Sequence, residues 1–283
     1  MSCRIIDGKA IAKGIREEIK RKTEILKTRG ITPGLAVILV GDDASSKIYV
    51  DNKIKACQEV GYYSEVMQLP GSSTDKEVLA AVNRLNSRPD IHGFIVQLPL
   101  PPQISEEKVI MAIDPKKDVD GLHPLNLGSL LIGHPRFIPC TPYGCMKFIE
   151  GMNYDLNGKQ AVVVGRSNIV GKPLAALLMH KNATVTICHS RTKNLAKITS
   201  QADVLIAAVG KAHIITADMI KPGAFVIDVG MNRLPTGKVV GDVDFVPACE
   251  KAAIITPVPG GAGPMTIAML LANTLEAVAY EQS

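Results

Sequence analysis

Short apolar runs of strand length alternate with segments of helical periodicity in the first half of the chain. Strands are predicted at Leu35–Val40, Tyr63–Gln68 and Phe94–Leu98, and helices at Ser45–Val60 and Thr74–Asn86. The second of these helices opens with Thr74-x-x-Glu77, the spacing of an N-terminal capping box. This alternation is typical of βαβ units and predicts an α/β fold with largely parallel sheets.

The second half repeats the alternation with more uniformly apolar strands. Because these runs carry apolar residues on both sides, they are expected to be buried parallel strands. The predicted strands are Ala161–Val164, Thr184–Cys188, Val204–Ala208 and Phe225–Val229, and a helical pattern at Thr266–Tyr280 ends the chain.

The length of 283 residues favours two domains at roughly 150 residues each. Between Asp114 and Gly144 the periodic pattern gives way to repeated Pro and Gly, which is typical of a connection between domains. We place the boundary near Pro139.

Composition excludes several function classes. The net charge is only +5, and the basic cluster Lys20-Arg21-Lys22 alternates with glutamates, which indicates a solvated helix face rather than a nucleic-acid site. Aromatic residues make up 4% with no Trp, so stacking on bases is disfavoured. A small anionic ligand fits this balance better.

The cysteines and the N-terminus favour a cytoplasmic protein. Six cysteines without CxxC spacing indicate neither a zinc site nor a disulfide framework, and no histidine pair has metal-ligand spacing. The N-terminus lacks an apolar signal core. The uncharged stretch Ala252–Leu275 is long enough for a membrane span, but we expect its prolines and glycines to interrupt any continuous helix.

A glycine-bearing turn follows the strand Ala161–Val164. Gly165-Arg166-Ser167 leads to Gly171 and to Pro173, which would lie in the first turn of a helix. Such a turn gathers backbone N–H groups and the positive end of a helix dipole, where a pyrophosphate is stabilised.

Spacing separates this turn from three similar motifs. Five residues lie between Gly165 and Gly171, and Lys172 is followed by Pro173, so a phosphate loop of a nucleotide hydrolase is excluded. Ile169 stands where a serine-hydrolase elbow needs its second glycine. The common Gly-x-Gly-x-x-Gly dinucleotide pattern is modified here by Ser167 and one extra residue.

The next strand indicates which dinucleotide is bound. A cofactor with a free ribose 2′-hydroxyl is normally met by Asp or Glu at its end, whereas this chain has His189-Ser190-Arg191. A guanidinium attracts a 2′-phosphate, so NADP is predicted over NAD. The alternative is that Arg191 is an ordinary surface residue.

Three segments of the first half carry candidate catalytic residues. Tyr49 and Lys53 are four apart on one helix face, a spacing that an amphipathic helix with a solvent-reaching lysine also explains. Gln97 ends a strand, where ligands of α/β sheets gather, or stabilises a turn. Asp120 suits an aminopyrimidine edge, or belongs to an Asp-Gly turn.

Together, these segments resemble the bifunctional methylenetetrahydrofolate dehydrogenase/cyclohydrolase family, in the family's order and over nearly the whole chain. One departure is Ala262, where the family usually carries Val. The matching segments are Tyr49–Cys57, Gln97-Leu98-Pro99-Leu100-Pro101, Lys117–Gly121, Pro139-Cys140-Thr141-Pro142, the Gly165 turn, and Thr256-Pro257-Val258-Pro259-Gly260-Gly261-Ala262-Gly263-Pro264-Met265-Thr266.

The resemblance implies a folate-binding catalytic domain of residues 1–139 plus 264–283 and a Rossmann-like NADP domain of residues 140–263, meeting at a cleft. It implies NADP-dependent oxidation of 5,10-methylenetetrahydrofolate to the 5,10-methenyl form and hydrolysis to 10-formyltetrahydrofolate, a product used in purine biosynthesis. It also implies a cytoplasmic homodimer that associates through the NADP domain, binds neither nucleic acid nor membrane, and needs no metal.

The family likeness also implies a role for each matching residue. Lys53 is the acid–base group, and Tyr49 and Gln97 orient it or tune its pKa. Asp120 anchors the pterin. The remaining contacts are Leu98, Pro99, Pro259, Gly260 and Gly261 for folate, and Gly165, Arg166, Ser167, Ser190 and Arg191 for NADP.

Two other functions remain open from the residues alone. One is an NADP-dependent dehydrogenase of another small substrate, such as a shikimate-type hydroxy acid, which has the same domain order. The other is a cofactor-binding regulatory or scaffold protein without catalysis.

Overall fold

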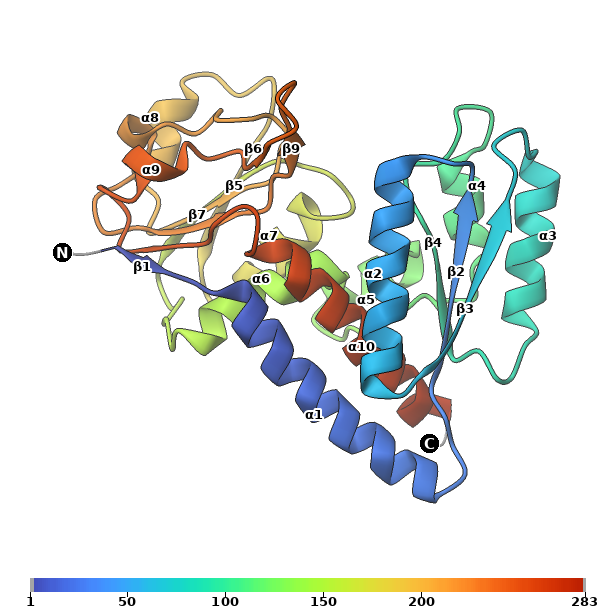
Figure 1. The fold of residues 1–283 in the computed structure, drawn as a ribbon. Helices are drawn as coiled ribbons and strands as arrows, with labels where there is room; N and C mark the ends of the chain where they lie inside the picture. The colour runs from blue at the N-terminus through green and yellow to red at the C-terminus, as the bar shows by residue number, and fades with distance from the viewer. Residues whose placement is uncertain (1–2, 282–283) are drawn as a thin grey trace. The chain divides into compact units, whose positions relative to one another are not determined.

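The computed structural model describes residues 3–281, which form two compact units (Figure 1). Unit 1 comprises residues 3–12, 130–134 and 141–266, and unit 2 comprises residues 13–129, 135–140 and 267–281. Two long helices, α1 (Gly8–Thr28) and α10 (Ala262–Glu281), pass from unit 1 into unit 2. The exposed basic cluster lies on α1, where Lys22 pairs with Glu18, as expected of a solvated helix face.

Unit 2 is built on a three-stranded parallel sheet in the order β3-β2-β4. Helices α3 and α4 cover one face, and α2 lies on the other side (Figure 1). The strands are β2 (Gly34–Val40), β3 (Tyr63–Leu69) and β4 (Gly93–Val96), and the helices are α2 (Ala44–Val60), α3 (Asp75–Asn86), α4 (Glu106–Ala112) and α5 (Pro124–Leu131), whose end reaches unit 1.

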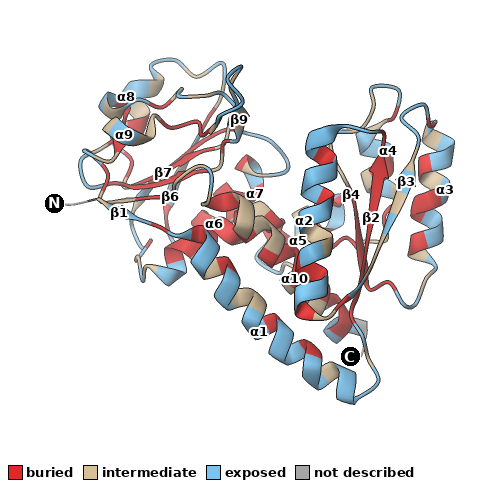
Figure 2. Cartoon of the chain, viewed as in Figure 1, coloured by how far each residue is buried: buried red, intermediate tan, exposed pale blue. Residues whose placement is uncertain are grey.

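The predicted elements of unit 2 are confirmed to within two residues. The capping box is present, since the Thr74 side chain accepts from the Glu77 N–H and the Glu77 carboxylate accepts from the Thr74 N–H. Figure 2 shows β2 buried throughout and α3 buried on one side only. The central strand therefore holds the apolar core between its helices.

Unit 1 is a six-stranded parallel sheet in the order β1-β11-β8-β7-β5-β6. Its strands are β1 (Arg4–Ile5), β5 (Gln160–Val164), β6 (Thr184–Cys188), β7 (Val204–Ala207), β8 (Phe225–Asp228) and β11 (Ile254–Ile255). A small antiparallel pair joins β9 (Asn232–Arg233) to β10 (Val239–Val240). The helical elements are α6 (Cys140–Gly151), α7 (Gly171–His180), α8 (Leu195–Thr199), the 3-10 turn η1 (Ala217–Met219) and α9 (Phe245–Ala248).

The structure corrects three expectations about local structure. The first concerns β6, which was expected to be buried on both faces. Only its Cys188 is buried, because β6 is the last strand of the sheet and has no neighbouring strand on its outer side. The second concerns Asp114–Gly144, which was expected to be a connection without regular structure. It contains α5 and the start of α6, with Pro124 and Pro142 in their first turns, where a missing N–H costs nothing.

The third correction concerns the C-terminal apolar stretch. Prolines and glycines were expected to interrupt any continuous helix over Ala252–Leu275, and those before α10 do so, since β11 and a loop occupy residues 254–261. The exceptions are Gly263 and Pro264, because α10 begins at Ala262 with Pro264 in its first turn and continues to Glu281. Among the described residues, α10 is the one helix that is long and apolar enough to cross a membrane. Of its apolar segment, 56% is buried inside the protein. Buried Asn273 donates from Nδ2 to the carbonyls of Val119 and Ile138, at 2.8 Å each.

The N-terminal residues pair with the sheet of unit 1. The Arg4 N–H donates to the Ala253 carbonyl, and the Ile6 N–H donates to the Ile255 carbonyl. The predicted domain division placed residues 1–139 together, whereas residues 3–12 and 130–134 lie in unit 1. A two-residue strand such as β1 is too short to show a pattern in the sequence.

Candidate active site

Lys53, the lysine of the Tyr49–Cys57 motif, is held by Gln97, the glutamine of the Gln97–Pro101 motif. Lys53 lies on α2, and its ammonium donates to Gln97 Oε1 at 2.7 Å. Gln97 follows β4 directly and donates from Nε2 to the Leu98 carbonyl at 2.6 Å, which sets its oxygen toward the lysine. The peptide bond between Leu98 and Pro99 is cis. Sheet and helix thus bring together two residues that are 44 positions apart.

Burial disfavours the charge on Lys53. It lowers the pKa of the lysine below its usual 10.5, and the negative charge of Asp120 opposes that change. A lysine in this environment exchanges protons nearer to neutral pH than an exposed one, which is what an acid–base group requires.

Asp120, whose charge acts on the lysine, lies in a tightly bonded loop. Buried Asp118 accepts N–H bonds from His123 and from the Asn126 side chain, both at 2.7 Å. Gly121 adopts a φ of +73°, and a side chain there would meet the backbone at Ile138 and Pro139, so glycine is required. Burial raises the pKa of Asp118 to about 7.

Tyr49 lies one turn before Lys53 on α2 and is 40% exposed. The predicted set Tyr49, Lys53, Gln97 and Asp120 therefore lies in unit 2 on α2, the end of β4 and the loop before α5. Sequence reasoning assigned no role to Cys140, whose buried thiol donates to the Val119 carbonyl. Its place in the Pro139–Pro142 motif was a signal that could have identified it.

The glycine turn of unit 1 lies at the carboxyl end of β5. Gly165 has a φ of +135°, and a Cβ there would collide with the Ala208 carbonyl. A Cβ on Gly171 would collide with the Gly165 carbonyl, so helix α7 can start close against the turn only with glycine. Ser167 Oγ accepts from the N–H of Val170 at 3.1 Å and caps this start.

The residues predicted to meet the 2′-phosphate follow neighbouring strands. Val164 pairs with Cys188, so Arg166 and Ser190 each lie two residues beyond a paired position. The Thr192 N–H donates to the His189 carbonyl at 2.8 Å, which closes a turn with Ser190 and Arg191 at its centre. Arg166, Ser190 and Arg191 are all exposed.

These residues fit NADP. Strands β6 and β7 lie on opposite sides of β5, and ligands of open α/β sheets bind where the strand order reverses in this way. Glycines leave the backbone accessible at that point, and two guanidinium groups suit a phosphate.

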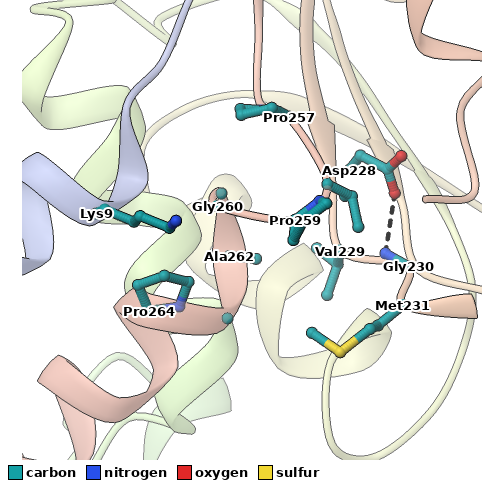
Figure 3. Close-up of a pocket in the computed structure, with 13 residues that line it drawn as sticks. Lys9, Asp228, Val229, Gly230, Met231, Pro257, Pro259, Gly260, Ala262 and Pro264 are labelled. Carbon is teal, nitrogen blue, oxygen red and sulfur yellow. Dashed lines mark hydrogen bonds between the residues drawn. The ribbon is translucent and has the colours of Figure 1, made fainter. Parts of the chain in front are cut away.

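The predicted folate contacts Pro259, Gly260 and Gly261 lie in unit 1, before α10. They line a cavity of about 160 Å³ together with Lys9 and the segment Asp228–Met231 (Figure 3). The Lys9 side chain extends toward Gly260. Gly8 fits only as glycine, because a Cβ there would collide with the carbonyls of Gly260 and Gly261.

Two buried carboxylates that sequence reasoning missed brace the wall of this cavity. Asp228 accepts from the N–H groups of Gly230, Asp242 and Val243, and burial raises the pKa of Asp228 to about 6. Asp242 accepts from the N–H groups of residues 209, 210 and 211. A carboxylate at the last position of a buried strand was the available signal for Asp228.

Comparison with known proteins decides the family. Residues 6–120 match the tetrahydrofolate dehydrogenase/cyclohydrolase catalytic domain, and residues 139–282 match the NAD(P)-binding domain of the same family. The chain belongs to the tetrahydrofolate dehydrogenase/cyclohydrolase family. The predicted resemblance, α/β fold and enzyme class are thereby confirmed, and the shikimate-type and non-catalytic alternatives are excluded.

Relatives support this assignment over the full length. The chain is 59% identical to "Bifunctional protein FolD" of Polaromonas sp. over 98% of each chain. The crystal structure of the bifunctional FolD enzyme of Campylobacter jejuni matches with a TM-score of 0.97 at 49% identity, covering 99% of this chain and 100% of that one. The Trypanosoma brucei enzyme, complexed with NADP and an inhibitor, matches with a TM-score of 0.96 at 38% identity, covering 100% and 99%.

The predicted reactions are those of this family. The chain catalyses NADP-dependent oxidation of 5,10-methylenetetrahydrofolate to the 5,10-methenyl form, and hydrolysis of that product to 10-formyltetrahydrofolate.

Proposed function

We propose that Lys53 is the acid–base group of the hydrolysis and that its pairing with Gln97 and Asp120 sets its protonation. The observation that carries this proposal is the bond from the partly buried Lys53 ammonium to Gln97 Oε1. Because burial favours the neutral amine, Lys53 can accept a proton from water.

The oxidation needs positioning more than proton transfer. The methylene carbon lies between two nitrogens whose lone pairs stabilise the cation left when a hydride departs, so this step requires no base. NADP, when bound, accepts that hydride. In this proposal Arg166, Ser190 and Arg191 hold its 2′-phosphate, and the Gly165 and Ser167 backbone receives its pyrophosphate.

In the hydrolysis, the oxygen of a water molecule forms a bond to the methenyl carbon while Lys53 takes the proton released. The remaining hydroxyl proton of this adduct then leaves to water as the bond from that carbon to N5 breaks, and the proton on Lys53 passes to N5, so that one proton is released overall. The product is 10-formyltetrahydrofolate with no net change in oxidation state. Gln97 orients the lysine, and Tyr49 lies one turn before it on the same face of α2 and contributes to the folate site.

The remaining contacts fix the folate. The Asp120 carboxylate accepts two N–H bonds from the aminopyrimidine edge of the pterin. Leu98 and Pro99, next to Gln97, provide apolar contact beside the ring, and the Pro259-Gly260-Gly261 turn presents backbone that a ligand can approach closely.

The test is a parallel measurement of both reactions in Lys53→Met. We expect the cyclohydrolase rate to fall about 10³-fold, the usual worth of a positioned acid–base group, and the dehydrogenase rate to fall much less. Lys55→Met, exposed on the same helix, is the matched control. Hydrolysis that survives in Lys53→Met would make the lysine structural.

We further propose that the enzyme is a homodimer that associates through unit 1. The edge strand β6 supports this, because Ile187 is 40% exposed there, with Ile169 and Met179 similarly exposed on the same unit. Light scattering is expected to give twice the chain mass for the wild type and a single chain mass for Ile187→Lys. A monomeric wild type would contradict the proposal.

We also propose that the enzyme is cytoplasmic. Its partners are folates rather than nucleic acid or membrane, and its 10-formyl product is used in purine biosynthesis. The free cysteines, the small net charge and the partly buried α10 support this. Cell fractionation tests the location, and loss of purine prototrophy on gene deletion tests the use.

A further inference from the structure

Two cysteines far apart in the chain have thiols in contact. Cys3 precedes β1, and Cys249 follows α9, 246 positions along the sequence. Both side chains pack against the apolar cluster that includes Ala248 and Ile255, and Cys249 lies close enough to raise the pKa of Cys3. Both are partly buried, whereas the four other cysteines are buried.

The backbone on both sides of this pair is fixed. The Arg4 N–H, next to Cys3, donates to the Ala253 carbonyl at 2.8 Å. The Cys249 N–H donates to the Phe245 carbonyl at 3.0 Å, at the end of α9. The contact between the thiols is therefore built into the pairing of β1 with β11 rather than produced by a free chain end.

Strand β1, which directly follows Cys3, is weakly held. Strand β1 is two exposed residues at the edge of the sheet. Such a strand opens locally at a small free-energy cost. It leads into Gly8 and Lys9, which lie at the Gly260–Gly261 turn and the cavity, so its hold on the sheet sets where that end of α1 lies.

We propose that Cys3 and Cys249 form a reversible disulfide that locks the N-terminal strand onto the sheet of unit 1. The oxidant is a low-molecular-weight disulfide such as oxidised glutathione. The Cys249 sulfur displaces one glutathione thiol and forms a mixed disulfide; the Cys3 sulfur then attacks the Cys249 sulfur and releases the second. The two cysteines lose two electrons and two protons, and both pass to the two glutathione thiols.

The chemistry of Cys3 gives this bond a characteristic rate. Burial and the adjacent Cys249 raise the pKa of Cys3 to about 11, so little of it is thiolate at neutral pH. Because the thiolate is the attacking species and burial disfavours it, closure is slow at pH 7 and accelerates as the pH rises. The chain is therefore reduced by default and becomes cross-linked under sustained oxidation.

The test compares full-length wild type with Cys3→Ser and Cys249→Ser, each incubated with oxidised glutathione and mapped by non-reducing peptide mass spectrometry. We expect a Cys3–Cys249 cross-linked peptide in the wild type, none in either variant, and its loss on adding dithiothreitol. Circular dichroism of the three reduced proteins checks that they fold alike.

A second readout measures the lock itself. The Ile6 N–H donates to the Ile255 carbonyl, so its hydrogen exchange reports the opening of β1. Oxidation is expected to slow this exchange about tenfold or more in the wild type and to leave it unchanged in Cys3→Ser, with Leu39 of β2 as the control amide. Separate glutathione adducts on the two cysteines, or a cross-link without slower exchange, would overturn the proposal.

Discussion

The residues around Lys53 and those around Gly165 differ in how many of their side-chain polar groups are hydrogen-bonded within the protein. Around Lys53 in unit 2, polar groups bond to one another: the ammonium to Gln97, the Gln97 amide to Leu98. Around Gly165 in unit 1, Arg166 and Arg191 are exposed on turns whose hydrogen bonds serve the backbone.

This difference follows from what each region is proposed to do. A lysine that transfers protons needs a pKa set in advance by burial and neighbours, and only a preformed, bonded environment provides it. A phosphate is held by guanidinium groups that can remain hydrated until it arrives. The chemistry therefore requires order in unit 2 and accessibility in unit 1.

The largest effect should come from Gly165→Ala. The φ of +135° and the approach of the Ala208 carbonyl leave no room for a Cβ, so we expect the free energy of unfolding to fall by about 3 kcal/mol and NADP binding to be lost. Gly151→Ala, with open space around it at the end of α6, is the control and should raise stability by up to about 1 kcal/mol. Chemical denaturation and calorimetric titration measure both effects. A fully stable, NADP-binding Gly165→Ala would refute the proposed role of the turn.

A smaller and more selective effect is expected for Arg191→Ala. Losing one charge-assisted hydrogen bond should weaken NADP binding about 10- to 100-fold and leave NAD binding nearly unchanged. Lys181→Ala, exposed at the end of α7, should change neither affinity. Titration of the wild type and both variants with NADP and with NAD measures this, and equal losses for the two cofactors would count against a 2′-phosphate contact.

The smallest effect is a shift in a pH profile. The Asp120 charge raises the pKa of Lys53, so Asp120→Asn lowers that pKa further and increases the neutral amine at a given pH. The rising limb of the cyclohydrolase profile should move to lower pH, along with a lower maximal rate from the lost pterin contact. Asp51→Asn, exposed on α2, should not move it. A shift to higher pH would contradict the assignment of Lys53 as the base.

The sequence predicted the larger strands because buried parallel strands are continuous apolar runs, as β2 and β8 show. The pairs β1 with β11 and β9 with β10 are two residues long and carry no periodicity to detect. Prolines caused the misses at α5, α6 and the start of α10. Pro173 was interpreted as part of a helix start, but Pro124, Pro142 and Pro264, which also lie in first turns, were interpreted as interruptions.

The candidate site divides in the same way. Lys53 and Gln97 were identified from motif and strand position, but spacing alone left Lys53 open as a solvent-reaching lysine, and only the structure shows its bond to Gln97. Cys140 and Asp118 act through burial, which depends on packing between segments distant in sequence and has no local signature. The roles of all the site residues stay predictions.

The most direct test of the central claim is an NMR titration of the Lys53 side-chain nitrogen in protein labelled with ¹⁵N-lysine, with the signal assigned by its absence in Lys53→Met. The account predicts that Lys53 titrates below the usual 10.5 and that its midpoint coincides with the rising limb of the cyclohydrolase pH profile. A Lys53 that titrates like the exposed Lys55, or a limb that does not follow its midpoint in Asp120→Asn, would contradict it.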